Sequence, residues 1–341
     1  MKWLQWLGLP VGIAVLIALV VRDGAGDVLR VIGMAGPVLL WLVPFHLLPL
    51  LFDAQGWRLL LDRRLPLGFL LWIATVREAI NRLLPAVGVG GEIVGIRLAR
   101  WRMNDGSFAA ATVIVEVMIT IAVQYAFSAL GLVLIVAATG DGGSLRTIVT
   151  IALALLLTMP LPIIAVLLLR RGGVFHAIER FAGRMLGGTR QIAPGIDGHR
   201  LDGDIDALMS RTGLMLRTFC WQLAGYMLGA FETWWALRLL GHPVSIGGAL
   251  AIEALTQAVR HAAFMVPAGL GIQEAAVVLL AQLFGVGSEV ALSLALVKRM
   301  REVIFGCLAL LSWQAAEIVR TRRRLRDGPP SAPNPHREEA H

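Results

Sequence analysis

Cysteine and lysine are nearly absent from this sequence. Its 341 residues include only two cysteines, Cys220 and Cys307, and only two lysines, Lys2 and Lys298. Both cysteines fall in strongly apolar segments, so they indicate neither a disulfide framework nor a redox compartment. Positive charge is therefore carried almost entirely by arginine.

Motifs of soluble catalysis are also missing. The sequence has no Gly-x-x-x-x-Gly-Lys-Ser/Thr phosphate loop, no Gly-x-Ser-x-Gly elbow, no His-Glu-x-x-His and no Cys-x-x-Cys. Its longest polar stretches, 170–213 and 320–341, are too short for a soluble catalytic domain. These absences argue against an ATP-driven pump and a two-domain enzyme. We expect no enzymatic activity and no metal or other cofactor.

Charged residues are few, whereas apolar residues are abundant. Apolar side chains make up 57% of the chain and charged ones 16%, and the mean hydropathy is +0.73. Apolar runs of about 20 residues match a hydrocarbon core ~30 Å thick. The net charge of +8 comes from arginines clustered in loops and at the C-terminal end, so it does not indicate a nucleic-acid partner. The composition predicts an all-α polytopic membrane protein.

The apolar runs predict about six full transmembrane helices and two re-entrant or broken helical hairpins. The helices are expected near 3–21, 34–52, 107–138, 147–169, 214–240 and 288–319, and the hairpins over 66–100 and 247–285. All of them belong to one transmembrane domain, 1–319. The arginine- and proline-rich end, 320–341, is expected to be a disordered tail.

The two hairpins share an unusual order of residues. In each, a helix with charged residues stops at a Pro-Ala pair that begins at Pro85 or Pro267, and a glycine-rich turn follows. A glutamate, Glu92 or Glu274, stands seven residues after the proline. Proline cannot continue a helix, and glycine adopts the backbone angles of a tight reversal. Paired broken helices in matching halves of an apolar chain indicate a transport site.

Two alternatives to this interpretation stay open. Chance interruptions by proline and glycine occur in ordinary spans. Each hairpin can also consist of two short full crossings, which would keep the topology and change the geometry of the site.

The distribution of arginine predicts the topology. The segments richest in arginine are 58–64, 97–102, 170–211 and 320–326, so we place all four in the cytoplasm. Both chain termini are then cytoplasmic. The hairpin 66–100 starts and ends on the cytoplasmic side, whereas the hairpin 247–285 starts and ends outside.

This topology contains an inverted repeat. The unit 34–138 recurs as 214–319 in the opposite orientation, and the cytoplasmic loop 170–213 lies between them. Inverted repeats bring two half-sites together near the membrane midplane. Within the loop, apolar residues at helical spacing from Phe175 to Met185 indicate a short helix on the membrane surface, although a solvated loop explains the same stretch.

Ionisable residues are frequent inside the predicted membrane segments. One Asp, Lys or Arg at a helix centre costs about 2.5–3.5 kcal/mol, so several of them must form pairs or face water. Glu78 and Arg82 are four residues apart, as are Lys298 and Glu302, and each pair is predicted to share a helix face. His46, alone in an apolar span, is expected to be a hydrogen-bonded core histidine.

Polar residues also recur at four-residue steps, which places them along one flank of a helix. The first such stripe is Thr112, Glu116, Thr120, Gln124 and Ser128, and the second is Glu253, Gln257 and His261. The stripes favour a hydrated groove or cavity between the two halves. For Arg97, Arg299 and Arg301, positions near helix ends with side chains that reach the interface are an equal alternative.

The hairpin residues resemble a known family. Arg77-Glu78, Asn81, Leu83-Leu84-Pro85 and Gly90-Gly91-Glu92, together with Val266-Pro267-Ala268-Gly269-Leu270-Gly271-Ile272-Gln273-Glu274, are similar to the lysylphosphatidylglycerol synthase transmembrane (flippase-like) family. The segment 298–302, Lys-Arg-Met-Arg-Glu, resembles the hopanoid-biosynthesis-associated subgroup of that family. The resemblance covers residues 1–325 and implies translocation of lipid headgroups across the inner membrane. The soluble aminoacyl-transferring domain of the full-length synthases has no counterpart here, so lipid aminoacylation is not expected.

Together, these patterns predict a bacterial inner-membrane lipid translocase, a flippase or scramblase whose partners are hopanoid or phospholipid molecules. A homo-oligomer is possible. The residues expected to bind the headgroup or balance its charge are Arg77, Asn81, Arg82, Glu92, Glu116, Arg260, His261, Glu274, Arg301 and Glu302. An ion-coupled carrier of small solutes is the first alternative and predicts an enclosed midplane cavity, whereas a translocase needs a groove open to lipid. An integral-membrane enzyme acting on a lipid headgroup is the second.

Overall fold

The computed structural model describes residues 33, 36–83, 90–139, 198–262 and 272–326. Every element in these ranges is a helix, and none of the described residues forms a β-strand. Several predictions fall outside them: the spans 3–21 and 147–169, the surface helix near 175–185, the two hairpin prolines and the tail after Arg326.

The first group of helices begins with η1 (Pro37–Trp41), α3 (Leu42–Phe45) and α4 (Leu47–Leu60), which follow one another with almost no break. They are followed by α5 (Leu67–Leu83), α6 (Gly90–Ala99) and α7 (Gly106–Thr139). Helices α5 and α6 pack against each other, as expected for the predicted hairpin.

The second group repeats this order. It consists of α12 (Thr212–Leu239), α13 (Ile246–Ala262), α14 (Ile272–Leu283) and α15 (Ser288–Arg326), and it is preceded by α11 (Gly198–Ser210). Helix α15 continues past the predicted end of the span at 319 and includes residues 320–326, which were assigned to the predicted tail. Apart from Thr321, the stretch from 320 to 326 consists of arginine and leucine and contains no proline or glycine, and arginine and leucine favour a helix.

Three of the described helical segments are long and apolar enough to cross a membrane: Pro37–Leu60, Gly106–Ala138 and Ser288–Arg323. Each overlaps a predicted span, but the first continues to Leu60, eight residues past the predicted end at 52. An all-helical protein with several membrane-spanning helices is thus confirmed. The described residues do not test the total of six spans or the depth of the hairpins.

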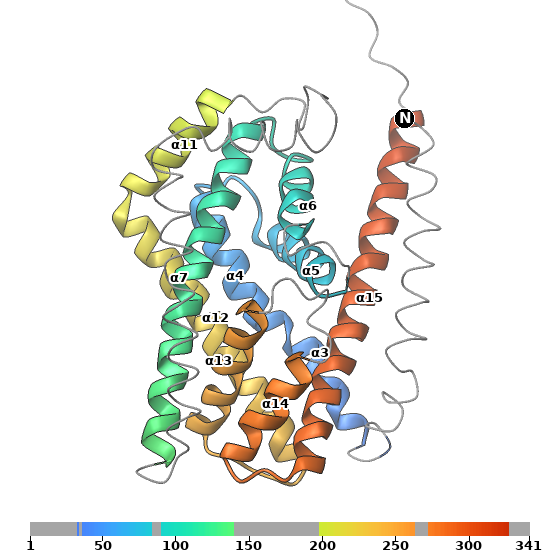
Figure 1. Ribbon diagram of the computed structural model, residues 1–341. Helices are drawn as coiled ribbons and strands as arrows, with labels where there is room; N and C mark the ends of the chain where they lie inside the picture. Colours follow the sequence, from blue (N-terminus) through green and yellow to red (C-terminus); the bar gives the residue numbers. More distant parts are fainter. Residues whose placement is uncertain (1–32, 34–35, 84–89, 140–197, 263–271, 327–341) are drawn as a thin grey trace, which may run out of the picture.

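The two groups run in opposite directions. Figure 1 shows α7 and α15 along the length of the molecule with opposite orientation, with α5 and α6 toward one end and α13 and α14 toward the other. Helices α5 and α13 hold equivalent places in the two groups, and each packs against the long helix of the other group: α5 against α15, and α13 against α7. Helices α4 and α12 pack against each other.

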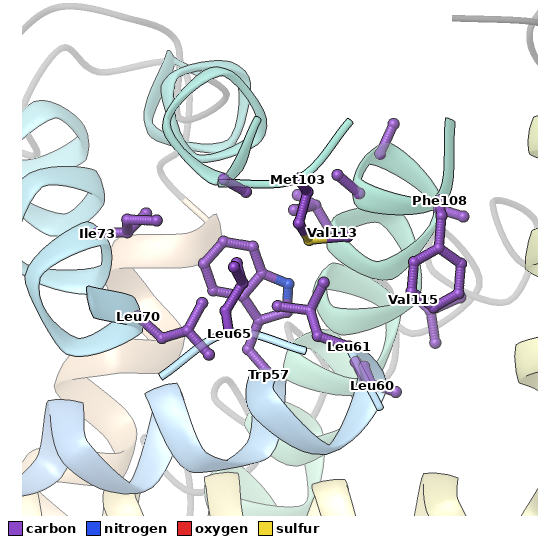
Figure 2. Close-up of a cluster of buried hydrophobic side chains, with 14 of the residues drawn as sticks. Trp57, Leu60, Leu61, Leu65, Leu70, Ile73, Met103, Phe108, Val113 and Val115 are labelled. Atoms are coloured by element: carbon purple, nitrogen blue, oxygen red, sulfur yellow. The ribbon is translucent and has the colours of Figure 1, made fainter. Parts of the chain in front are cut away.

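Each group has its own apolar core. In the first, Trp57 is completely buried among Leu65, Leu70 and Met103, and Figure 2 shows its indole between helices of this group. The second core is built mainly from α13, α14 and α15 and includes Met300. Charged residues border both cores: the Arg77 guanidinium lies over the Trp57 ring, 5.0 Å from its centre, and Met300 stands between two arginines in the chain.

Candidate functional site

The first charged group joins α5, α6 and α7. The Arg77 guanidinium on α5 donates to Glu116 Oε2 on α7 at 2.8 Å, and its Nη2 lies 3.5 Å from Glu92 Oε1 on α6. Asn81, one turn after Arg77, donates from Nδ2 to the same Glu92 carboxylate at 3.2 Å and accepts a bond from the backbone N–H of Gly91 at 2.9 Å. Four predicted site residues therefore meet at one point.

Two glycines of α6 allow this close approach. A Cβ atom at Gly91 would stand 2.6 Å from the backbone oxygen of Arg77, and one at Gly95 would stand 2.8 Å from the Arg77 side chain. Real Cβ atoms do not come so close to their neighbours. The glycines of the hairpin thus bring α6 against α5, so that Glu92 in the first turn of α6 reaches Arg77.

The second charged group joins both halves of the molecule. His46, between α3 and α4, lies between two carboxylates: its Nε2 is 2.8 Å from Glu78 Oε2 on α5, and its Nδ1 is 3.1 Å from Glu232 Oε2 on α12. On α15, Arg301 contacts the same Nδ1, and its Nε is 3.0 Å from Glu232 Oε1. The expectation of a hydrogen-bonded His46 is confirmed, although its partners are charged.

Arg82 and Glu302 extend this group along the contact between α5 and α15. Arg82 donates to Glu302 Oε1 at 3.1 Å, and its Nε lies 3.4 Å from Glu78 Oε1. Glu302 is also 3.4 Å from Arg299 and 3.8 Å from Arg301. His46, Glu78, Arg82, Arg301 and Glu302 line a cavity of about 10 Å³, which has room for about one water molecule.

The pairing of Lys298 differs from the prediction. Lys298 on α15 contacts Glu253 on α13 rather than Glu302, four residues further along its own helix. Glu253 also accepts bonds from Thr233 at 2.6 Å and Gln257 at 2.9 Å. Helical spacing places two side chains on one face, but a neighbouring helix decides which partner is nearer.

The polar stripe of α7 does not line an open groove in this structure. Glu116, Gln124 and Ser128 are buried, and the stripe bonds to other helices instead. Thr112 accepts a bond from Trp57 at 3.2 Å, and Thr120 donates to Gln222 at 3.3 Å. Along this stripe, and among the described residues, helix packing takes the place of the predicted hydrated groove, because the stripe faces α4, α5 and α12.

The other three predicted site residues belong to the second hairpin. Arg260 and His261 lie in the last turn of α13, and Glu274 lies in the first turn of α14. The His261 ring accepts a bond from Gln124 on α7 at 2.6 Å. Glu274 holds the place on α14 that Glu92 holds on α6.

Sequence reasoning missed two carboxylates, Glu232 and Asp53. Glu232 is buried in the last third of α12. Asp53 on α4 accepts a bond from Gln222 at 3.3 Å. A single acid within the predicted span 214–240 was the available signal for Glu232, whereas Asp53 stands one residue past the predicted end of its span.

This arrangement can hold many charges at low energetic cost. Buried ions are tolerated when each one has an opposite partner and further hydrogen bonds. Two atoms of these groups are exceptions, Glu116 Oε1 and Arg301 Nε. Both are buried and have no hydrogen-bond partner among the described residues, although Arg301 Nε lies at ion-pair distance from Glu232. Across the same residues, no group of three or more His, Cys, Asp or Glu side chains is arranged to hold a metal ion.

Comparison with known proteins gives one match. No curated protein and no solved structure matches this chain. The model of one family, the lysylphosphatidylglycerol synthase TM region, matches residues 5–309. This match covers both hairpins and all the charged groups described above. The chain therefore belongs to the family of the lysylphosphatidylglycerol synthase transmembrane region.

Proposed function

We propose that this protein is a lipid translocase, a flippase or scramblase that moves a polar lipid across a bacterial inner membrane. The family ties the chain to a membrane protein of lipid metabolism. The observation that carries the proposal is the charged network between the two halves, in which α5, α12 and α15 contribute Glu78, Glu232 and Arg301 to one buried group around His46.

Such a network can exchange partners instead of losing them. A phosphate or hydroxyl-rich headgroup that reaches Arg82 or Arg301 replaces a carboxylate oxygen by its own oxygen, so each cation keeps a partner. The acids released in this exchange still have other cations nearby. The ions therefore remain balanced while a polar group passes, which lowers the main electrostatic cost of crossing hydrocarbon.

The contact between α5 and α15 is the proposed path. The two helices belong to opposite halves, and the Arg82–Glu302 pair lies between them. Separation of these helices would open the network sideways to lipid, so that the acyl chains stay in the bilayer.

The finer parts of the proposal rest on the sequence. The proposed cargo is a hopanoid or a phospholipid; the hopanoid is included because the segment 298–302 resembles the hopanoid-associated subgroup. Both termini are placed in the cytoplasm by the distribution of arginine. We propose no enzymatic activity for this region, and its partners are membrane lipids.

Lipid movement in reconstituted vesicles tests the proposal. The full-length protein should accelerate the transfer of a fluorescent lipid between leaflets relative to protein-free vesicles, with a hopanoid and a phospholipid compared. The variants Arg82→Gln and Glu302→Gln should lower this rate at least tenfold and still insert, because each remaining charge keeps another partner. Arg97→Gln is the matched control, since Arg97 pairs with Glu317 of α15 but is 59% exposed.

Two outcomes contradict the proposal. A wild-type rate equal to that of empty vesicles for both lipids would exclude a translocase. Normal rates in both Gln variants would mean that the network holds the helices together and takes no part in transport.

A further inference from the structure

An open groove of about 550 Å³ lies away from the charged network, where α5 begins and α15 ends. Its walls combine three aromatic side chains, Phe69, Trp72 and Trp101, with three arginines, Arg102, Arg320 and Arg323. Its volume falls in the range of small-molecule sites. None of these six residues belongs to the site predicted from the sequence.

Two of the arginines and the three rings form a row of neighbouring planar groups. The Arg102 guanidinium lies 4.4 Å from the centre of the Phe69 ring, and the Arg320 guanidinium lies 4.4 Å from the centre of the Trp101 ring. Trp72 joins the two ends, with ring centres 5.7 Å from Phe69 and 5.8 Å from Trp101. A guanidinium stacked on a ring uses its face, whereas its N–H donors lie in its plane and can bind oxygen atoms.

The helices at the groove are held together by polar contacts. Trp72 Nε1 on α5 donates to Ser312 Oγ on α15 at 3.0 Å. Arg97 at the end of α6 pairs with Glu317 on α15 at 2.6 Å. The Glu317 carboxylate near the groove is therefore neutralised, and the lining itself contains three cations and no anion.

An apolar stripe leads from the groove along α15. Ala315, Ala316 and Val319 form the floor of the groove, and the same helix face continues with Leu311 and Leu308, four and seven residues before Ala315. Leu308, Leu311 and Val319 are 59%, 51% and 50% exposed. Large apolar residues exposed on a membrane-spanning helix face hydrocarbon, so this stripe suits an acyl chain.

We propose that the groove binds an anionic membrane lipid, with its phosphate at Arg102, Arg320 and Arg323 and an acyl chain along the α15 stripe. Arg320 and Arg323 stand at the end of the candidate span Ser288–Arg323, which is the depth of lipid headgroups. Three cations match a phosphate, and the apolar stripe distinguishes a lipid from a free anion. The assignment rests on the proposed translocase, in which this groove is the first stop of the lipid before the contact between α5 and α15.

Binding can be measured without transport. The full-length protein in phosphatidylcholine nanodiscs should show quenching of tryptophan fluorescence by brominated phosphatidylglycerol, and the Trp72→Phe/Trp101→Phe variant should lose this part of the signal. Replacing Arg102, Arg320 and Arg323 by Gln should weaken the apparent affinity roughly tenfold to hundredfold, because each basic residue near a charged membrane surface contributes about 1 kcal/mol. A matched triple variant, Arg63→Gln/Arg217→Gln/Arg238→Gln, removes three exposed arginines outside the groove and should bind like the parent.

The outcomes separate the groove from the translocase. The lipid site would be overturned if both triple variants lost the same affinity for phosphatidylglycerol. It would also be overturned if glycerophosphate, which has no acyl chains, displaced the brominated lipid as well as unlabelled phosphatidylglycerol does. Loss of phosphatidylglycerol binding only in the groove variant supports it, even if vesicles show no lipid movement. Normal lipid movement together with unchanged binding in the groove variant would leave the translocase intact and exclude the groove.

Discussion

At the scale of single residues, Arg77 holds the first charged group together. It is buried, and it reaches carboxylates on two other helices while its guanidinium lies over Trp57. The Glu116 side chain is 1% exposed, so without Arg77 its charge would have no described cation to pair with. Removal of one member of a buried pair costs more than the pair itself contributes, because the remaining ion stays desolvated.

The variant Arg77→Met should therefore lower the free energy of unfolding in detergent by about 3–5 kcal/mol. Arg77→Met/Glu116→Gln should recover a large part of that loss, since the charge left behind is also removed. Thermal unfolding of the purified variants measures both effects. Arg97→Gln, in a more exposed pair, should cost no more than ~1 kcal/mol; a similar loss there would mean that burial does not decide the cost.

At the scale of elements, the contact between α5 and α15 depends on one small residue. A Cβ atom at Gly306 on α15 would stand 2.4 Å from Leu83 Cδ1 and 3.7 Å from Ala79 Cβ on α5. Leu83 is buried, so it has little room to move away. Gly306 lies one helical turn from Glu302, and it thus determines how closely the Arg82–Glu302 pair can form.

Gly306→Ala should destabilise the protein by about 1–3 kcal/mol through overpacking. The higher helix propensity of alanine offsets up to ~1 kcal/mol of this cost. In a Leu83→Ala background the same substitution should be neutral or stabilising, because the obstructing side chain is gone. Gly229→Ala on α12 is the control, as its Cβ would meet nothing within 4 Å. Equal shifts of the unfolding midpoint at Gly306 and Gly229 would rule out the close contact.

At the scale of the whole molecule, two groups of helices of the same order face in opposite directions (Figure 1). Helices α5 and α13 each pack on the long helix of the other group. Both groups therefore contribute residues to the charged network: His46 and Glu78 come from the first, and Glu232 and Arg301 come from the second.

Accessibility of single cysteines tests the orientation. In a variant without Cys220 and Cys307, a cysteine at His242, between α12 and α13, should react with an impermeant thiol reagent added outside intact cells. Cysteines at Asn104 and Arg323, which are also exposed, should react only after the membrane is permeabilised. The same labelling at His242 and Arg323 from outside would contradict the predicted topology, because one crossing by α15 and an even number by the hairpin separate them.

The sequence by itself determined the helical class, the membrane environment, the ends of most described helices to within a few residues, and the family. These properties depend on local patterns: apolar runs match the bilayer thickness, and proline and glycine mark where helices stop. Helices α4 and α15 end at Leu60 and Arg326, past the predicted span ends at 52 and 319, because a helix can continue beyond the apolar run that marks a span.

Only the tertiary structure decided which charges pair. Helical spacing favoured Lys298 with Glu302, yet Lys298 contacts Glu253 and Glu302 binds Arg82. The partners come from helices far apart in the chain, and their distances depend on how closely α5, α13 and α15 approach. The groove of stacked rings and arginines depends on tertiary packing in the same way, because Trp101 and Arg320 become neighbours only when the end of α15 lies beside the first hairpin.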